Sequence, residues 1–240
     1  MAGRIAEPPL NEAARARIDN FVDSAFAFAV TLLVISTGEP PSDLDGLKSA
    51  LWRVPGFAMG FALVAMFWWT HRSYSRVRPD GAVPLLISLA VVFVILVYVY
   101  PLRLFSDVFV SFVRGEVQQG SGPMRSVSLM RDLYLIYGAG FAALSALYLF
   151  AFSHAAGAAK RAGDEVARRY AAAGASVWIV LTLAGVMSIT LAAFLPFEIS
   201  TWTVALPGFC YALIPVGIGV VTAVRRGRRN AVETVREEGA

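Results

Sequence analysis

Residues 83–105 read VPLLISLAVVFVILVYVYPLRLF and decide the class of fold. The stretch has no charged side chain before Arg103, and it exceeds the roughly 20 apolar residues with which a helix crosses about 30 Å of hydrocarbon. The whole chain agrees, because 57% of its 240 residues are hydrophobic and 16% are charged, against about 45–50% and about 25% in soluble domains. The sequence therefore predicts an integral membrane protein. It excludes a disordered chain, and the single cysteine excludes a disulfide scaffold.

Six apolar segments of this kind follow one another along the chain. They span residues 21–35, 54–70, 83–105, 129–152, 171–195 and 204–224. The first two are short, and the first contains Asp23 and Thr31, which suit the interior of a helix bundle better than a lipid-facing surface. We expect an all-α membrane protein whose six transmembrane helices occupy residues 21–224, after an N-terminal segment (1–20) and before a basic tail (225–240).

The basic residues predict the orientation of these helices. With the N-terminus in the cytoplasm, the segments on the inner side carry 15 Lys and Arg residues and those on the outer side carry 6. This asymmetry follows the positive-inside rule, so we expect both termini in the cytoplasm and a multi-pass protein of the cell (plasma) membrane. The basic excess then requires no nucleic acid as partner. A further role of the 225–229 cluster in binding anionic lipid headgroups remains open.

Turn-forming residues predict the connections between the segments. Outer loops are expected over residues 38–43 and 114–124, and a tight inner turn is expected over 78–81. A short charged inner connection is expected over 157–169.

The sequence offers little for catalysis. It contains no Gly-rich phosphate loop, paired metal-ligand motif or nucleophile elbow. Its two histidines, His71 and His154, lie far apart, and its acidic residues sit at segment ends. We therefore expect a protein that is not an enzyme and that needs no cofactor.

The first apolar segment carries the most specific pattern. Residues 17–35 read RIDNFVDSAFAFAVTLLVI, in which small residues alternate with large ones, and small residues let membrane helices approach closely. Helical spacing places Phe28, Thr31, Leu32 and Ile35 on one face, as an apolar stripe with a single hydroxyl. Periodicity alone leaves open whether this stripe packs against other helices or lines a pathway.

Polar residues near the start of this helix predict how it is held. Arg17 and Asp23 are six residues apart, about 600° around a helix, so they share no face and must find partners on other helices. Trp68 and His71, at the end of the second segment, are expected at the same membrane level. We predict a network of these four residues that fixes the first helix against the second. Snorkelling of Arg17 and a place for Trp68 in an aromatic belt are the alternatives.

Two motifs resemble those of the lysosomal potassium channel family (transmembrane protein 175), in particular its prokaryotic members. The first helix of that family reads Arg-x-x-x-Phe-Ser-Asp and then a small, apolar run that ends in Ala-x-Thr-Leu-Leu-Val. The residues that match here are Arg17, Phe21, Asp23, Ala27, Ala29, Thr31, Leu32, Leu33 and Val34. The stretch 68–74 (WWTHRSY) resembles the Trp-x-x-His-His motif of the family and includes Trp68 and His71.

The resemblance implies a potassium-selective channel formed by a homotetramer in the lipid bilayer, with the first helix of each subunit lining the pore. By position, Phe28 would form the narrowest ring, followed outward by Thr31, Leu32 and Ile35, with potassium in the pore near Thr31. Two positions depart from the family pattern: Val22 replaces a serine, and Phe28 stands where Ile or Leu is usual. A secondary transporter, or a non-conducting membrane protein on the same scaffold, is the alternative function.

Overall fold

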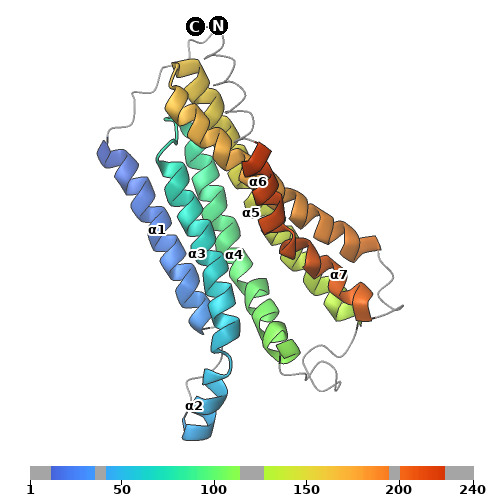
Figure 1. Ribbon diagram of the computed structural model, residues 1–240. Coiled ribbons are helices and arrows are strands. Elements are labelled where there is room, and N and C mark those ends of the chain that lie inside the picture. Colours follow the sequence, from blue (N-terminus) through green and yellow to red (C-terminus); the bar gives the residue numbers. More distant parts are fainter. Residues whose placement is uncertain (1–11, 36–41, 114–126, 195–200, 225–240) are drawn as a thin grey trace, which may run out of the picture.

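The computed structural model describes residues 12–35, 42–113, 127–194 and 201–224, and every regular element in these ranges is a helix. The elements are α1 (Glu12–Ile35), α2 (Leu44–Leu51), α3 (Val54–Ser75), α4 (Ala82–Val113), α5 (Val127–Ala162), α6 (Glu165–Phe194) and α7 (Thr201–Ala212). After a turn at Leu213 the chain is helical again to Val224. In Figure 1, α1, α3 and α4 lie side by side, and α4 connects them to the long α5–α6 hairpin, on which α7 packs.

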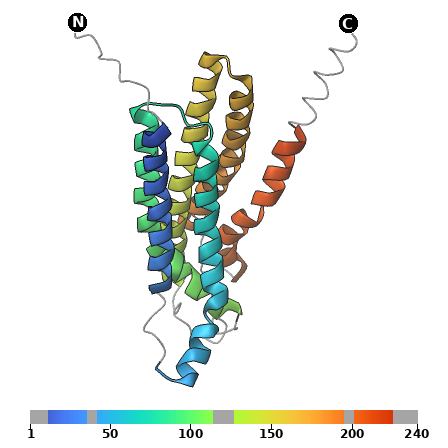
Figure 2. The ribbon, with the colours of Figure 1, turned by 90° about the vertical axis from the view of Figure 1, so that its left-hand side faces the viewer.

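Six helical segments are long and apolar enough to cross a membrane, which confirms the predicted fold class. They are Glu12–Ile35, Val54–Ser75, Ala82–Leu104, Arg131–Ala162, Glu165–Phe194 and Leu206–Val224. Successive spans run in opposite directions, so the start of α1, the α3–α4 turn, the α5–α6 turn and the end of the last helix lie at one end of the bundle (Figures 1 and 2). We call this end the turn end. Residues 1–11 of the predicted N-terminal segment (1–20), residues 38–41 of the predicted outer loop (38–43), and the predicted segments 114–124 and 225–240 lie outside the described residues.

The connection between α5 and α6 differs from the expectation. The prediction of a charged connection over residues 157–169 is wrong, because α5 continues to Ala162 and α6 begins at Glu165. Only Gly163 and Asp164 separate the two helices, and Gly163 adopts a φ of +73°, a left-handed conformation that glycine reaches without steric cost. The predicted tight turn over 78–81 lies between α3 and α4, where Gly81 has a φ of +125°.

Charged residues explain why the helices run past their apolar segments. Such residues are costly in lipid but are good helix formers in water. In α6, Glu165 pairs with Arg168 at 2.6 Å and with Arg169 at 2.7 Å, one helical turn further on. α1 likewise begins at Glu12, well before residue 21. A hydropathy pattern therefore marks the membrane-crossing part of a helix and not its ends.

The short helix α2 follows the predicted outer loop and was not expected from the sequence. Its start is capped by Asp43, whose carboxylate accepts a hydrogen bond from the backbone N–H of Gly46 at 2.7 Å. Lys48 pairs with Asp45 on its exposed side at 3.0 Å. Eight residues are too few to cross a bilayer, so α2 leaves the number of spans at six.

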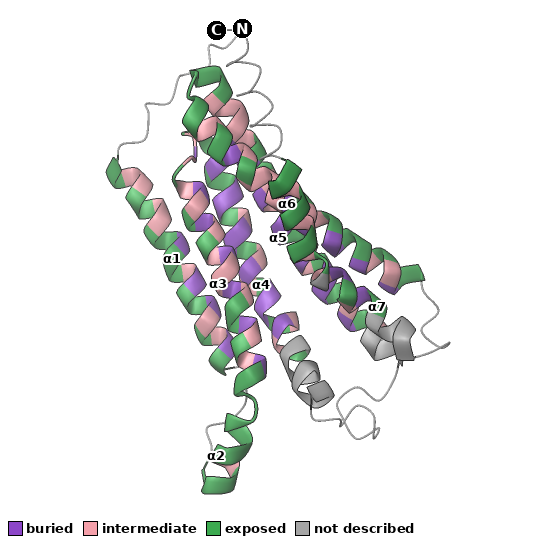
Figure 3. Ribbon diagram, viewed as in Figure 1, coloured by how far each residue is buried: buried purple, intermediate pink, exposed green. Residues whose placement is uncertain are grey.

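The core is aromatic and lies between α3, α4, α5 and α6. At its centre Phe67 is completely buried, and its ring stacks on those of Tyr148 and Trp178 at centroid distances of 6.1 and 5.8 Å. Tyr98 and Phe141 meet the same ring edge-on at 6.4 and 5.9 Å. Figure 3 shows the buried residues on the facing sides of these helices.

Glycine makes one close approach in this core possible. A Cβ added to Gly140 of α5 would lie 2.2 Å from the ring of Tyr98 on α4. Since side-chain packing rather than water exclusion holds helices together in lipid, this contact helps to fix α4 against α5. α1 lies at the edge of the bundle, where it packs against α3 and α4.

Candidate pore helix and its attachment

The two sides of α1 differ sharply in burial. One stripe packs against α3 and α4 and consists of Val22, Phe26, Ala29 and Leu33. The opposite side is uncovered in the single chain, where Phe28 is 55% exposed and Ile35 is 66% exposed. A membrane-spanning helix with an uncovered side contacts lipid, a second protein chain or a pathway.

The predicted pore residues fall mainly on this uncovered side. Phe28, Thr31 and Ile35 are exposed, whereas Leu32 is half-buried and packs against the core. The Thr31 hydroxyl donates a hydrogen bond to the backbone carbonyl of Ala27 at 3.0 Å. Because its proton is used in this way, the Thr31 oxygen is oriented to accept and can face a cation.

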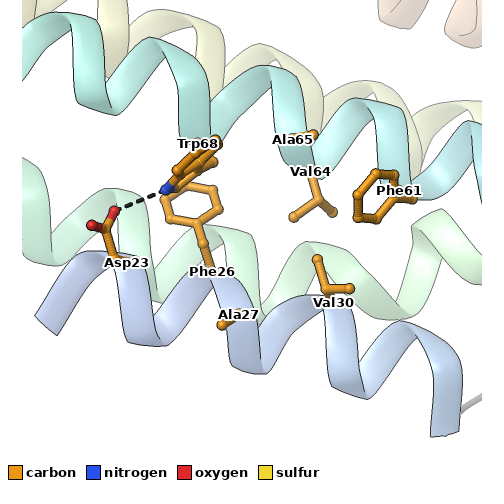
Figure 4. Close-up of a pocket in the computed structure, with 8 residues that line it drawn as sticks. All are labelled: Asp23, Phe26, Ala27, Val30, Phe61, Val64, Ala65 and Trp68. Carbon is orange, nitrogen blue, oxygen red and sulfur yellow. Dashed lines mark hydrogen bonds between the residues drawn. The ribbon is translucent and has the colours of Figure 1, made fainter. Parts of the chain in front are cut away.

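Asp23 and Trp68 join the two helices directly. The indole Nε1–H of Trp68 donates a hydrogen bond of 2.8 Å to Oδ1 of Asp23 (Figure 4). The pair closes one end of an apolar groove of about 340 Å³ between α1 and α3, whose other lining residues are Phe26, Ala27, Val30, Phe61, Val64 and Ala65. Arg72 lies over the Trp68 ring at 5.9 Å from its centroid, a cation–π contact on the same side.

The other residues of the predicted network lie apart from this bond. His71 is buried between the rings of Tyr74 and Tyr148, and within the described residues neither of its nitrogens has a hydrogen-bond partner. Arg17 and Phe21 are exposed. The structure thus brings Asp23 and Trp68 together, and a joint network with Arg17 and His71 stays a prediction.

A second attachment, absent from the sequence analysis, holds the start of α1. The guanidinium of Arg78 donates to Asp19 at 2.7 Å, and the Ser75 hydroxyl donates to the same carboxylate oxygen at 2.9 Å. Arg15 pairs with Asp80 at 2.6 Å. The side chain of Arg78 is only 5% exposed, so this ion pair is shielded from solvent.

The spacing of residues could have revealed this attachment. Asp19 and Asp23 are four residues apart on α1, and Trp68 and Ser75 are seven apart on α3, so each pair shares one helix face. Two antiparallel helices that meet along these faces bring Asp23 to Trp68 and Asp19 to Ser75.

A metal site is not evident in the described part of the chain, which contains no cluster of three or more His, Cys, Asp or Glu side chains suited to a metal ion.

Comparison with known proteins shows which proteins this chain resembles. Residues 17–101 match the sequence model of a family described as the endosomal/lysosomal potassium channel TMEM175. The match covers about a third of the chain, so this region is similar to the TMEM175 family. A protein of Marivirga tractuosa named "Potassium channel" is 34% identical over 102 residues, which are 42% of this chain and 40% of that protein. The aligned part of the chain thus spans less than half of this relative.

The fold of nearly the whole chain is similar to that of a solved channel structure. A crystal structure of a variant of the potassium channel MtTMEM175, in complex with a nanobody–MBP fusion protein, has a TM-score of 0.74 and covers 95% of this chain and 99% of that one. The sequences are 21% identical, so this comparison concerns the fold. The range that matches the TMEM175 family model contains most of α1, all of α2 and α3 and most of α4, and it includes the Asp23–Trp68 bond.

We expect Asp23→Ala to lower the stability of the folded protein by about 1.5–3 kcal/mol, the usual contribution of a hydrogen bond to a charged group. Thermal unfolding in detergent, followed by size-exclusion chromatography, measures the change. Trp68→Phe should give a similar loss, and the double variant should lose little more than either single variant.

Two variants control this experiment. Asp45→Ala removes an acid from an exposed pair with Lys48 and should change stability by less than about 1 kcal/mol. Asp23→Asn keeps an acceptor oxygen and should retain most of the stability. Equal melting temperatures for Asp23→Ala and the parent protein would show that the bond contributes nothing.

Proposed function

We propose that this protein is a potassium-selective channel of the TMEM175 type, whose pathway is lined by the uncovered side of α1. The observation that carries the proposal is the stripe of Phe28, Thr31 and Ile35, which is exposed although α1 is a membrane-spanning helix held firmly on its other side. The similarity to proteins that are named potassium channels supports it.

The stripe suggests how selectivity and closure would arise. Phe28 would form an apolar constriction, which can stop ions by excluding water rather than by charge. Thr31 lies one turn further along, about 4.5 Å by helical rise, and its accepting oxygen would contact a potassium ion that has lost part of its hydration shell. Leu32 and Ile35 would continue the apolar wall, Leu32 with only its exposed part.

A ring of subunits follows from the position of α1. A single α1 lies at the edge of one bundle and cannot enclose a pathway by itself. Closed cyclic symmetry would place the same stripe of every copy around one axis, and the family resemblance favours a homotetramer. We propose that it resides in the plasma membrane, with potassium as the permeant ion and no cofactor.

Reconstitution into liposomes tests the function. Potassium-loaded vesicles should show uncoupled efflux that rises with the potassium gradient. Saturable flux coupled to a second ion would favour a secondary transporter, and absence of flux would favour the non-conducting alternative.

In the same assay, Thr31→Val should reduce the preference for potassium over sodium by about fivefold, a coupling of roughly 1 kcal/mol. The variant keeps the side-chain volume and removes only the hydroxyl. Assembly should not change, because the Ala27 carbonyl that loses this donor still accepts its helical hydrogen bond. Thr70→Val, which removes a hydroxyl bonded to the Met66 carbonyl on α3 at 2.9 Å, is the control and should leave selectivity as in the parent protein.

The proposed orientation makes a separate prediction. In a background with Cys210→Ala, a cysteine at Ser42 should react with a membrane-impermeant maleimide from outside the cell, and one at Ala162 should react only after the membrane is permeabilised. Both positions are exposed and lie at opposite ends of the bundle. Labelling of Ala162→Cys from outside would reverse the orientation.

A further inference from the structure

Three polar residues lie on the uncovered side of α1, which the proposed function places around the pathway. Asn20, Ser24 and Thr31 are all exposed. Steps of four and seven residues turn a helix by about 400° and 700°, so the three side chains lie within about 40° of one another. Phe28 follows Ser24 by one turn on the same side. By helical rise, Ser24 therefore lies about 6 Å from Phe28 toward the turn end, and Thr31 lies about 4.5 Å from it toward the other end.

The uncovered side of α4 differs from that of α1. Between residues 83 and 97 of α4 the exposed side chains are Val83, Leu85, Leu86, Leu89, Phe93 and Val97. All six are apolar, as expected of a helix side that contacts hydrocarbon, where polar side chains are costly. Contact with lipid alone therefore does not explain three polar residues on one side of α1, whereas a pathway that holds water and ions does.

The Ser24 hydroxyl is oriented like that of Thr31. It donates a hydrogen bond to the backbone carbonyl of Asn20 at 2.8 Å, as the Thr31 hydroxyl donates to the Ala27 carbonyl. Because the proton is used within the helix, the Ser24 oxygen is oriented to accept and can face a cation. Arg17 lies on the same side of α1 about 10 Å nearer the turn end by helical rise. Its long side chain can extend to the aqueous edge and leave the level of Ser24 to a cation.

We propose that the Ser24 residues of the assembled subunits form a second cation site, on the turn-end side of Phe28. This inference rests on the proposed pathway along α1 and adds a binding site to it. A potassium ion binds there between the Ser24 hydroxyl oxygens and water, crosses the Phe28 ring, and reaches the level of Thr31, about 10 Å away by helical rise. A site on each side of the constriction lets an ion enter and leave favourably, which conduction through a narrow filter requires.

Conductance in planar bilayers tests this site, with the potassium concentration varied on one side at a time. Labelling of Ala162→Cys identifies the side of the turn end. Ser24→Ala should raise the half-saturating potassium concentration on that side by about fivefold, the scale that one lost polar contact usually gives, and should change it little on the other side. Ser24→Thr keeps the hydroxyl and should behave like the parent protein. The matched control is Ser73→Ala on α3, which removes a hydroxyl bonded to the Trp69 carbonyl at 2.9 Å.

Thiol labelling of the purified protein in detergent tests the same site without ion conduction. In a Cys210→Ala background, a cationic methanethiosulfonate reagent should modify Ser24→Cys. The reaction should be about threefold slower in potassium chloride than in N-methylglucamine chloride, as mass action gives for an ion at twice its dissociation constant. Phe93→Cys, on the apolar exposed side of α4, should react far more slowly and equally in both salts.

The two experiments separate the Ser24 site from the proposed function. Labelling of Ser24→Cys that potassium slows, in a protein that does not conduct, would support the site and contradict the channel. Conduction by the parent protein together with an unchanged half-saturating concentration in Ser24→Ala would overturn the site and retain the channel. Labelling of Ser24→Cys at the same rate in both salts would also overturn the site.

Discussion

Phe28→Ala is expected to raise the flux of monovalent cations through the reconstituted protein by about tenfold or more and to weaken the preference for potassium over sodium. In the proposed homotetramer, four phenyl rings at one level of a narrow pathway would exclude water, and an ion that crosses this level would have to shed most of its hydration. Alanine widens the ring, so water and partly hydrated ions can pass. A barrier lowered by only about 1.4 kcal/mol corresponds to tenfold in rate.

The control for this change must be a phenylalanine that is equally exposed but lies away from α1. Phe150 of α5 meets this condition, since it is 53% exposed against 55% for Phe28. Phe26, the neighbouring residue that points about 200° away on α1, is unsuitable because it is buried in the core, where its loss would disturb the helix itself. Equal flux in Phe28→Ala, Phe150→Ala and the parent protein would place Phe28 outside the pathway.

A second large effect is expected from Phe67→Ala, which should lower stability by about 2–4 kcal/mol. Aromatic-to-alanine changes in soluble cores cost about 3–5 kcal/mol, but in lipid the contribution from burial away from water is absent and the lost packing remains. Phe67 contacts aromatic rings of three other helices, so its removal leaves a cavity that no single neighbour can fill.

Unfolding temperature and the yield of assembled protein measure this loss. Phe93→Ala removes the same side chain from a position on α4 that is 69% exposed and should be tolerated. Phe67→Leu should lie between the two. If Phe67→Ala has the same unfolding temperature as the parent protein, the aromatic cluster does not determine stability.

Four of the six spans were predictable because they are long apolar runs, and a bilayer admits few other structures for such a run. The ends of the helices were not predictable in this way. Lys160 and Arg161 mark the edge of the lipid but not the end of α5, which depends on Gly163 two residues later. The helix α2 was hidden because the turn residues before it dominate the pattern, although Asp43 is a good N-cap.

The attachment of α1 was predicted in part. Asp23 and Trp68 were singled out as polar residues inside or beside apolar segments, and the structure joins them. The Asp19–Arg78 pair was missed because Asp19 precedes the apolar run and Arg78 belongs to a turn, so neither stands out by hydropathy. Packing between side chains determines which helix faces meet, and a single sequence does not show it. Apolar periodicity alone therefore left open whether the Phe28–Ile35 stripe packs against other helices or lines a pathway.

The polar contacts described for α1 are concentrated in its first half, so the two halves of the helix are held differently. Arg15, Asp19 and Asp23 clamp its first half to α3 and the turn that follows, whereas Ala29 and Leu33 hold the second half through apolar contacts, which have no preferred direction. By helical rise, Ile35 lies about 18 Å from Asp23 and Phe28 lies about 7.5 Å from it. A rotation of α1 about its clamped first half would therefore displace Ile35 more than twice as far as Phe28.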